Sequence, residues 1–209
     1  MPKTVGDFFD KQSRCCSKRA RRKGVWKSSK VLLEELHRAG IEGRTVLEIG
    51  CGVGELSRTV LRDGAARVTG VDLSSKSLEE ARRISAEQGL ADRTEFVLAD
   101  ALTEPLPESD VLVMDRVLCC TPRAVEMLSR AVPITKNAVG FVVPYSKGVA
   151  SWPARIFNMA TRGFCRVIHS EFRPYVHDTR KLDESVRAHG FTRTAKRLSY
   201  PWIVMVYSR

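Results

Sequence analysis

Several features that mark well-known protein classes are missing from this sequence of 209 residues. No stretch approaches the roughly 20 uninterrupted apolar residues that a membrane-spanning helix needs. The N-terminal residues MPKTVGDFFDKQ lack the apolar core of a signal peptide, so we expect a cytoplasmic protein. The sequence has no internal repeat and no low-complexity segment. It also has no CxxC spacing, so we expect no zinc ribbon.

The cysteines do not form a disulfide or metal pattern. Six are present, as the adjacent pairs Cys15-Cys16 and Cys119-Cys120 and the single residues Cys51 and Cys165. Neighbouring cysteines rarely bond to each other, so the pattern indicates reduced thiols in an unexported protein. A soft-metal or arsenic site built from both pairs is an alternative, but packing is the favoured role and we predict no metal site.

Composition and charge indicate one globular domain with basic flanks. A hydrophobic content of 43% against 28% charged residues is typical of a globular protein. The net charge of +11 is uneven: +8 in residues 1–30, −5 in 31–143, and +4 in each of 144–177 and 178–209. The basic flanks suit an anionic small molecule, an anionic membrane surface or nucleic acid. A solvated basic tail is equally consistent with the N-terminal charge.

Apolar runs with strand period alternate with helical stretches, which predicts a parallel sheet flanked by helices. Strands are expected at 45–49, 67–71, 94–98, 111–114, 138–143, 191–200 and 202–207. Helices are expected from a cap at Ser28 or Ser29 to Gly40, and at 55–63, 74–89, 122–131 and 178–189. Residues 144–177 are expected to be irregular, and for 151–175 an amphipathic helix packed on the edge of the sheet is an equally good interpretation. We therefore predict an α/β, Rossmann-like fold: a seven-stranded, mostly parallel sheet, helices on both faces, and a hairpin of the last two strands.

The segment VLEIGCGVGELS joins the first predicted strand to a helix and carries glycines at alternate positions. Gly50, Gly52 and Gly54 let the backbone turn sharply and approach a ligand where any Cβ would collide. The helix that follows offers unpaired N–H groups to an anionic group. A dinucleotide motif would require glycine where Glu55 stands, and this carboxylate argues against NAD.

Acidic residues close the next three predicted strands. Asp72 follows the second strand, about 20 positions beyond the glycines, where an acidic residue can hold both hydroxyls of a ribose. Asp100 follows the third strand and can accept from an adenine amine; Asp115 follows the fourth. Ligands of open α/β sheets bind beyond the carboxyl ends of the strands, so these residues converge on one crevice.

In this order, VLEIGCGVGELS, VTGVDLS, FVLADAL and DVLVMDRVL resemble the cofactor motifs of class I S-adenosylmethionine-dependent methyltransferases over roughly residues 30–145. The resemblance implies S-adenosylmethionine as the cofactor. It places Glu48, Gly50, Cys51, Gly52 and Gly54 at the methionine part, Asp72 with Leu73 at the ribose, Asp100 with Ala101 at the adenine, and Asp115, Arg116 and Val117 near the sulfonium.

The flanking segments show weaker resemblances. VGDFFDKQ with the downstream RRKG is similar to the N-terminal part of small-molecule methyltransferases, which folds over the cofactor. DRVLCC, followed by an aromatic-rich insertion, most resembles magnesium-protoporphyrin methyltransferases, a substrate we do not carry over. We therefore expect a basic segment 1–30 that covers the cofactor and a methyltransferase domain 31–209, with a substrate-binding lid inserted at about 144–177.

Methyl transfer is an in-line displacement on an activated carbon, so the protein chiefly aligns the acceptor and excludes water. A general base is needed only for a protonated acceptor. The candidates are Tyr145 and His177, with His169 a weaker one, although an ordinary surface or packing role is the favoured interpretation of each histidine. Arg116 and Arg173 are candidates for binding a carboxylate or phosphate of the substrate.

The sequence is consistent with three alternative functions. The first is methyl transfer to a small molecule, anionic or aromatic, with peripheral membrane contact as an option. The second is methylation of RNA or another nucleic acid through the basic N-terminal segment, although MDRV replaces an NPPY-like motif after the fourth strand. The third is a non-catalytic cofactor-binding protein, which the fold alone does not exclude. The acceptor and the oligomeric state are not encoded in any motif.

Overall fold

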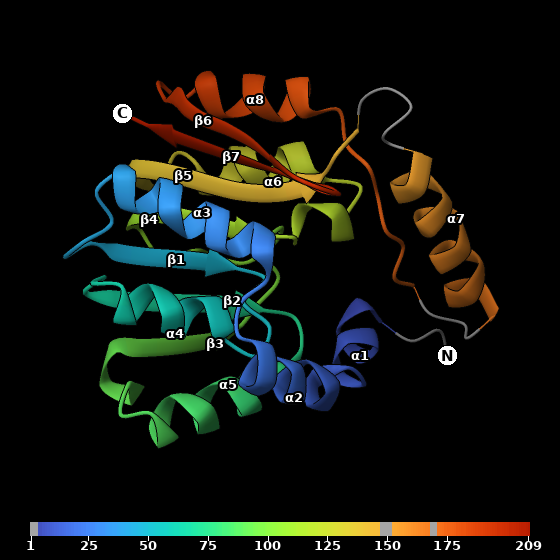
Figure 1. Ribbon diagram of the computed structural model, residues 1–209, viewed down its shortest axis with the longest axis horizontal. Helices are drawn as coiled ribbons and strands as arrows, with labels where there is room; N and C mark the ends of the chain where they lie inside the picture. The colour runs from blue at the N-terminus through green and yellow to red at the C-terminus, as the bar shows by residue number, and fades with distance from the viewer. Residues whose placement is uncertain (1–3, 147–151, 168–170) are drawn as a thin grey trace.

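One sheet of seven strands, in the spatial order β3-β2-β1-β4-β5-β7-β6, organises the chain (Figure 1). The computed structural model describes residues 4–146, 152–167 and 171–209. The strands are β1 (Thr45–Ile49), β2 (Arg67–Asp72), β3 (Thr94–Leu98), β4 (Ser109–Asp115), β5 (Thr135–Pro144), β6 (Thr192–Ser199) and β7 (Trp202–Ser208). The helices are α1 (Val5–Asp10), α2 (Ser13–Lys23), α3 (Lys27–Arg38), α4 (Glu55–Arg62), α5 (Ser75–Glu87), α6 (Ala124–Ala131), α7 (Trp152–Val167) and α8 (Thr179–Arg187), with short 3-10 turns η1 (Ala91–Arg93) and η2 (Leu118–Cys120).

The connections explain the strand directions. β1 pairs in parallel with β2 and β4, β2 with β3, and β4 with β5, because a crossover returns each new strand to the same edge of the sheet. β7 lies antiparallel between β5 and β6, because a short turn at Tyr200 and Pro201 joins β6 directly to β7. The predicted α/β fold, with its terminal hairpin, is confirmed.

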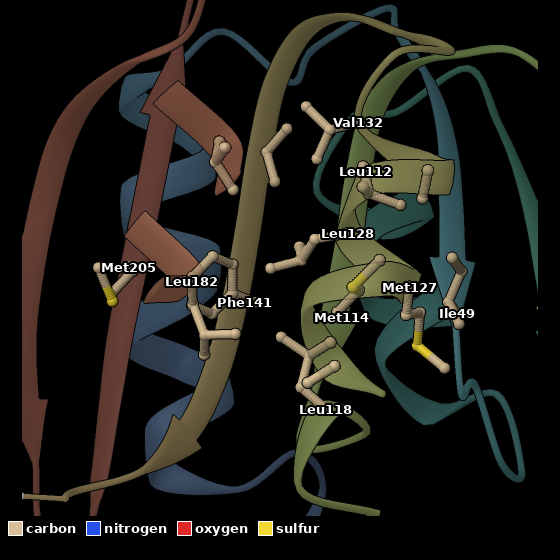
Figure 2. Packing of buried hydrophobic residues seen from close by; sticks show 14 of the residues in the cluster. Ile49, Leu112, Met114, Leu118, Met127, Leu128, Val132, Phe141, Leu182 and Met205 are labelled. Atoms are coloured by element: carbon tan, nitrogen blue, oxygen red, sulfur yellow. The ribbon is translucent and has the colours of Figure 1, made fainter. Parts of the chain in front are cut away.

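Helices cover both faces of the sheet, and each face has its own hydrophobic core. On one face, Leu32 and Leu36 of α3 pack with residues of α4 and the sheet. On the other face, Leu128 of α6 and Leu182 of α8 pack with Phe141 of β5 (Figure 2). Full burial of one such side chain stabilises by roughly 1.5–3 kcal/mol. The two cores therefore hold the carboxyl ends of the strands in fixed relative positions.

The first long helix begins earlier than expected. The prediction of a cap at Ser28 or Ser29 is wrong, because α3 starts at Lys27 with Trp26 as the residue before it. Both serines lie inside the helix and are buried. The hydroxyl of Ser29 donates to Asp115 Oδ2 at 2.6 Å, so this serine serves a tertiary contact with the end of β4 rather than a helix cap.

The stretch 144–177 is not irregular throughout. Residues 152–167 form the 16-residue helix α7, which the mixture of arginines and aromatic residues conceals in the sequence. Within residues 4–30, α1 and α2 are also helical. Figure 1 shows α1, α2 and α7 at the end of the sheet to which the arrowheads of β1 and β5 point. In the described part of the chain, no helix combines the length and apolar content needed to cross a membrane.

Candidate functional site

The glycine-rich turn after β1 needs glycine for two different reasons. Gly50, Gly52 and Gly54 have φ values of +75°, +53° and +70°, where any other residue is strained. A Cβ on Gly50 would stand 2.4 Å from Val117 Cγ2, and one on Gly54 would stand 2.9 Å from the ring of Phe96. A Cβ on Gly52 would meet no atom within 4 Å. Gly50 and Gly54 are thus required by internal packing, whereas Gly52 faces open space.

A buried arginine supports this turn from behind. Arg58 of α4 is completely buried, and its guanidinium donates to Val53 O at 2.8 Å and pairs with Glu55 at 3.0 Å. Burial is the largest effect on Arg58 and lowers its pKa, although Glu55 opposes this. A charge in the protein interior is stable only when it is paired and hydrogen-bonded, so the ion pair fixes the turn to the first turn of α4.

Asp72 ties the end of β2 to the glycine turn. Its Oδ2 accepts from the N–H of Gly52 at 2.7 Å and its Oδ1 accepts from the N–H of Ser74 at 2.8 Å. Burial raises the pKa of Asp72, while these backbone hydrogen bonds work in the opposite direction. A carboxylate has about four acceptor positions, so capacity for further hydroxyl donors is left on both oxygens.

Glu48 places a carboxyl group in the interior. It lies on β1, is 3% exposed and accepts from the hydroxyl of Ser57. Burial raises the pKa of Glu48 to about 8, with the negative Asp115 adding to the shift and Ser57 opposing it. The carboxyl group is therefore mostly protonated at neutral pH, and a cation brought next to it would favour ionisation.

Two arginines lie against one tryptophan beside Glu48. The guanidinium carbon of Arg19 is 3.4 Å from the centroid of the Trp26 ring, and that of Arg116 is 4.8 Å away. Arg116 also pairs with both oxygens of Asp115, at 3.2 and 3.1 Å. Its φ of +59° is the only positive value among the described non-glycine residues. Such strain costs about 1–3 kcal/mol, and in this conformation the guanidinium pairs with Asp115 and lies over the Trp26 ring.

Two adjoining cavities lie at this end of the sheet. The first has a volume of about 340 Å³ and the second about 250 Å³. The residues lining both are Cys16, Gly50, Gly52, Val53 and Arg116. Of the predicted cofactor residues, Asp72, Leu73, Asp100, Ala101 and Val117 line the first cavity alone, and Glu48, Cys51 and Asp115 the second alone. Gly54 lines neither of the two, because its place is in the packing behind the turn.

The N-terminal helices form one wall of the cavities. Val5 and Phe9 line the first cavity, and Arg19 lines the second. Asp10 fixes α1 to the start of α5, where its Oδ1 accepts from the Ser74 hydroxyl at 2.6 Å and from the N–H of Lys76 at 3.1 Å. The segment before α1 is set by a capping box between Thr4 and Asp7.

An aromatic cluster connects α1 with the segment before α8. The ring of Phe8 stacks on that of Phe172 with centroids 4.4 Å apart, and Phe9 meets Phe172 edge-on at 5.2 Å. Phe172 is buried. Its neighbours Glu171, Arg173 and Tyr175 line the first cavity, as residues of the glycine turn also do. The wall of the first cavity is thus continuous between the N-terminal helices and this late segment.

The two predicted catalytic residues lie outside the linings of these two cavities. Tyr145 packs against the hydrophobic core. His177 Nε2 lies 3.0 Å from Leu118 O and 2.9 Å from Thr121 O, so this nitrogen carries the proton and only Nδ1 is free to act as a base. Burial lowers the pKa of His177, against these hydrogen bonds. His169 lies outside the described residues.

Sequence patterns did not identify several of the lining residues. Arg19 and Trp26 lie outside the recognised motifs, and Arg58 is an arginine that a helical pattern predicts to be exposed. Val5 and Phe9 lie in VGDFFDKQ, for which a resemblance was noted but no residue was given a role. The apolar residues in VGDFF and the tryptophan between two basic runs were the available signals. Arg173, predicted to contact substrate, does line the first cavity, and its role there stays a prediction.

Comparison with known proteins agrees with this geometry. Residues 46–137 match a family model described as a methyltransferase domain. A probable chloroplastic tocopherol O-methyltransferase of Oryza sativa subsp. japonica is 37% identical over 65 residues, covering 31% of this chain and 18% of that protein. The chain matches less than half the length of this relative and of the next curated relatives.

Solved structures match over almost the whole chain. Magnesium protoporphyrin IX methyltransferase from Synechocystis PCC 6803 with bound S-adenosylhomocysteine gives a TM-score of 0.75 at 18% identity, covering 98% of both chains. The [4+2]-cyclase SpnF gives 0.74 at 18% identity, covering 100% of this chain and 96% of that one. Residues 46–137 thus belong to a methyltransferase domain, and the whole chain has the fold of S-adenosylmethionine-dependent methyltransferases.

The predicted methyltransferase domain is therefore confirmed over residues 46–137, and solved neighbours of the same fold hold S-adenosylhomocysteine or S-adenosylmethionine. In the methyltransferase domain, the matched residues 46–137 hold the glycine turn and the ends of β2, β3 and β4. α1, α2, α7 and α8 lie outside the matched residues. The cyclase among the neighbours shows that this fold also serves other chemistry, so likeness of fold leaves the acceptor open.

Proposed function

We propose that this chain transfers a methyl group from S-adenosylmethionine to a small-molecule acceptor by in-line displacement. The observation that carries the proposal is the pair of adjoining cavities that meet at Gly52, the one glycine of the turn whose missing Cβ opens onto free space. When bound, the cofactor supplies a methyl group on a positively charged sulfur. The residues of the chain bind it, orient it and exclude water.

The second cavity suits the amino-acid end of the cofactor. It combines the buried carboxyl group of Glu48 with the guanidinium groups of Arg19 and Arg116. An amino acid carries an ammonium and a carboxylate, and these are the complementary groups. Asp115 is engaged by Arg116 and by Ser29, so its role is to hold Arg116 in place. We assign Cys51 and Gly50 to the wall of this cavity.

The first cavity suits the nucleoside. Asp72 retains acceptor capacity for two ribose hydroxyls, with Leu73 beside it. Asp100 is placed to accept from the adenine amine, and Ala101 provides an apolar surface for the ring. Val117 fills the space left by Gly50 and separates the nucleoside from the acceptor side. α1 and α2 cover the cofactor in this assignment, as the segment 1–30 is expected to do.

The acceptor occupies the far side of the first cavity. There the lining changes to Arg173, Tyr175 and Glu171 with the apolar Met127, which suits a small acceptor with an aromatic or apolar body and an anionic group. Where the acceptor must lose a proton, the candidates are Glu171 and Tyr175, which line the cavity, whereas Tyr145 and His177 lie outside its lining. A cytoplasmic location stays a prediction.

Calorimetric titration with S-adenosylmethionine, S-adenosylhomocysteine and NAD tests the proposal. We expect micromolar binding of the first two ligands and none of NAD. Gly52→Val should abolish binding, because its side chain would project into the open space that joins the cavities. Asp72→Ala should weaken binding and also lower the thermal midpoint, because the N–H groups of Gly52 and Ser74 lose their acceptor. Binding of NAD alone, or equal binding by the Gly52→Val variant, would contradict the proposal.

Nucleic-acid methylation remains the second candidate because α2 presents exposed basic residues. Arg14, Lys18, Arg22 and Lys23 are exposed on this helix. Affinity for RNA that falls steeply with salt, together with methylation of that RNA, would favour this candidate. Absence of RNA binding at low salt would remove it. A non-catalytic role is excluded by turnover of the cofactor to S-adenosylhomocysteine with any acceptor.

A further inference from the structure

α7 carries an apolar stripe on its outer surface. Ile156, Met159 and Val167 are 55%, 70% and 77% exposed. In the described part of the chain, α7 therefore carries more large exposed apolar side chains than any other helix. Ala160 and Gly163 are also exposed. Residues 156, 160, 163 and 167 follow the spacing of one helix face, so the exposed apolar atoms form one continuous line.

The side of α7 opposite the stripe carries a buried residue. Cys165 lies about half a turn away from the stripe by helical spacing and is completely buried. The described side chains of α7 thus include one buried position, Cys165, and an exposed apolar face on the other side of the helix. Elsewhere in the described residues, large exposed apolar side chains lie one or two to an element, as Val125 of α6 and Leu198 of β6 do, which is normal for a protein surface.

The charged residues of α7 indicate which kind of partner its exposed apolar face fits. No Asp or Glu occurs from residue 127 to residue 170. α7 itself contains Arg155, Arg162 and Arg166, spaced by seven and four residues, which places their Cα positions along one side of the helix next to the stripe. An apolar stripe flanked by basic residues, without acidic ones, is the pattern of a helix that lies in the surface of an anionic bilayer.

We propose that the outer face of α7, defined by Ile156, Met159, Ala160, Gly163 and Val167, binds the surface of an anionic phospholipid membrane. The apolar side chains enter the acyl boundary, and the exposed Arg166 remains at the level of the phosphate groups. Because Arg173 and Tyr175 follow α7 in the chain and line the first cavity, this binding holds that side of the cavity toward the lipid. The binding itself does not depend on methyl transfer.

Flotation of the purified full chain with vesicles tests the proposal without cofactor or acceptor. We expect the protein to float with vesicles of phosphatidylcholine and phosphatidylglycerol, to float less with phosphatidylcholine alone, and to be released as salt rises. Ile156→Ser combined with Val167→Ser should weaken binding by about tenfold or more, because two apolar groups no longer enter the bilayer. Arg166→Gln should weaken only the preference for the anionic vesicles.

The matched control is Val125→Ser combined with Leu198→Ser, which removes exposed apolar groups from α6 and β6. It should float as the unchanged protein does, and circular dichroism should give all variants the same helix content. Failure of the unchanged protein to float with anionic vesicles would overturn the proposal. So would equal loss in the control, or binding to RNA that the α7 substitutions weaken, since the latter assigns the same face to nucleic acid.

Discussion

At the scale of single residues, we expect Glu48 to link cofactor binding to pH. Burial raises its pKa to about 8, and an ammonium group placed beside it favours the ionised form, so the pKa falls in the complex. Binding then releases a proton, and affinity should rise as pH increases toward 8 and level off above it. S-adenosylhomocysteine is the suitable ligand, because its neutral sulfur leaves the amine more basic than a sulfonium does.

Calorimetry in buffers of different ionisation enthalpy counts the protons released. In Glu48→Gln the slope of affinity against pH below 8 should disappear, while the contact with Ser57 is retained by the amide. A slope that survives in this variant would assign the titrating group elsewhere.

We expect His177 to stabilise the folded protein rather than to take part in catalysis. Its Nε2–H donates to the carbonyl oxygens of Leu118 and Thr121. These hydrogen bonds hold η2 next to the first cavity. His177→Ala leaves these partly buried acceptors without a partner and should lower the free energy of unfolding by about 1–3 kcal/mol. Urea unfolding measures this change. Unchanged stability together with lost turnover would instead support the predicted catalytic role.

At the scale of elements, the position of α1 depends on the absence of a side chain at Gly6. A Cβ there would stand 2.6 Å from the carbonyl oxygen of Leu73, so Gly6→Ala should push α1 away from the turn between β2 and α5. We expect cofactor to dissociate about tenfold faster, a change of about 1.4 kcal/mol, in stopped-flow displacement. Gly163→Ala is the control, because a Cβ there meets no atom within 4 Å; equal rates in the two variants would refute the closure of α1 over the cofactor.

At the scale of the whole molecule, a ligand that binds only the folded state should raise the thermal midpoint. S-adenosylhomocysteine at 100 times its dissociation constant adds about 2.7 kcal/mol, which corresponds to roughly 5–10 °C for a domain of this size. Differential scanning fluorimetry measures the shift. NAD at equal concentration should leave the midpoint unchanged, and a comparable shift with NAD would count against the cofactor assignment.

The sequence allowed prediction of the sheet because buried strands require apolar runs and the glycine turn requires residues that tolerate positive φ. Asp72 and Asp100 were predictable for the same reason, since strand ends fix their backbone positions. The placement of Tyr145 and His177 was not, because the direction of a side chain in a late segment depends on tertiary contacts such as those to Leu118. α1 and α2 were missed as helices because packing on α5, rather than helical periodicity, stabilises them.

The contact between Phe8 and Phe172 has a consequence for the order of events in turnover. It joins the segment over the nucleoside to the segment on the acceptor side, so displacing one disturbs the other. Loading of the nucleoside and admission of the acceptor are then not independent. In the proposed assignment of the two cavities, we therefore expect an ordered cycle in which the nucleoside binds before the acceptor.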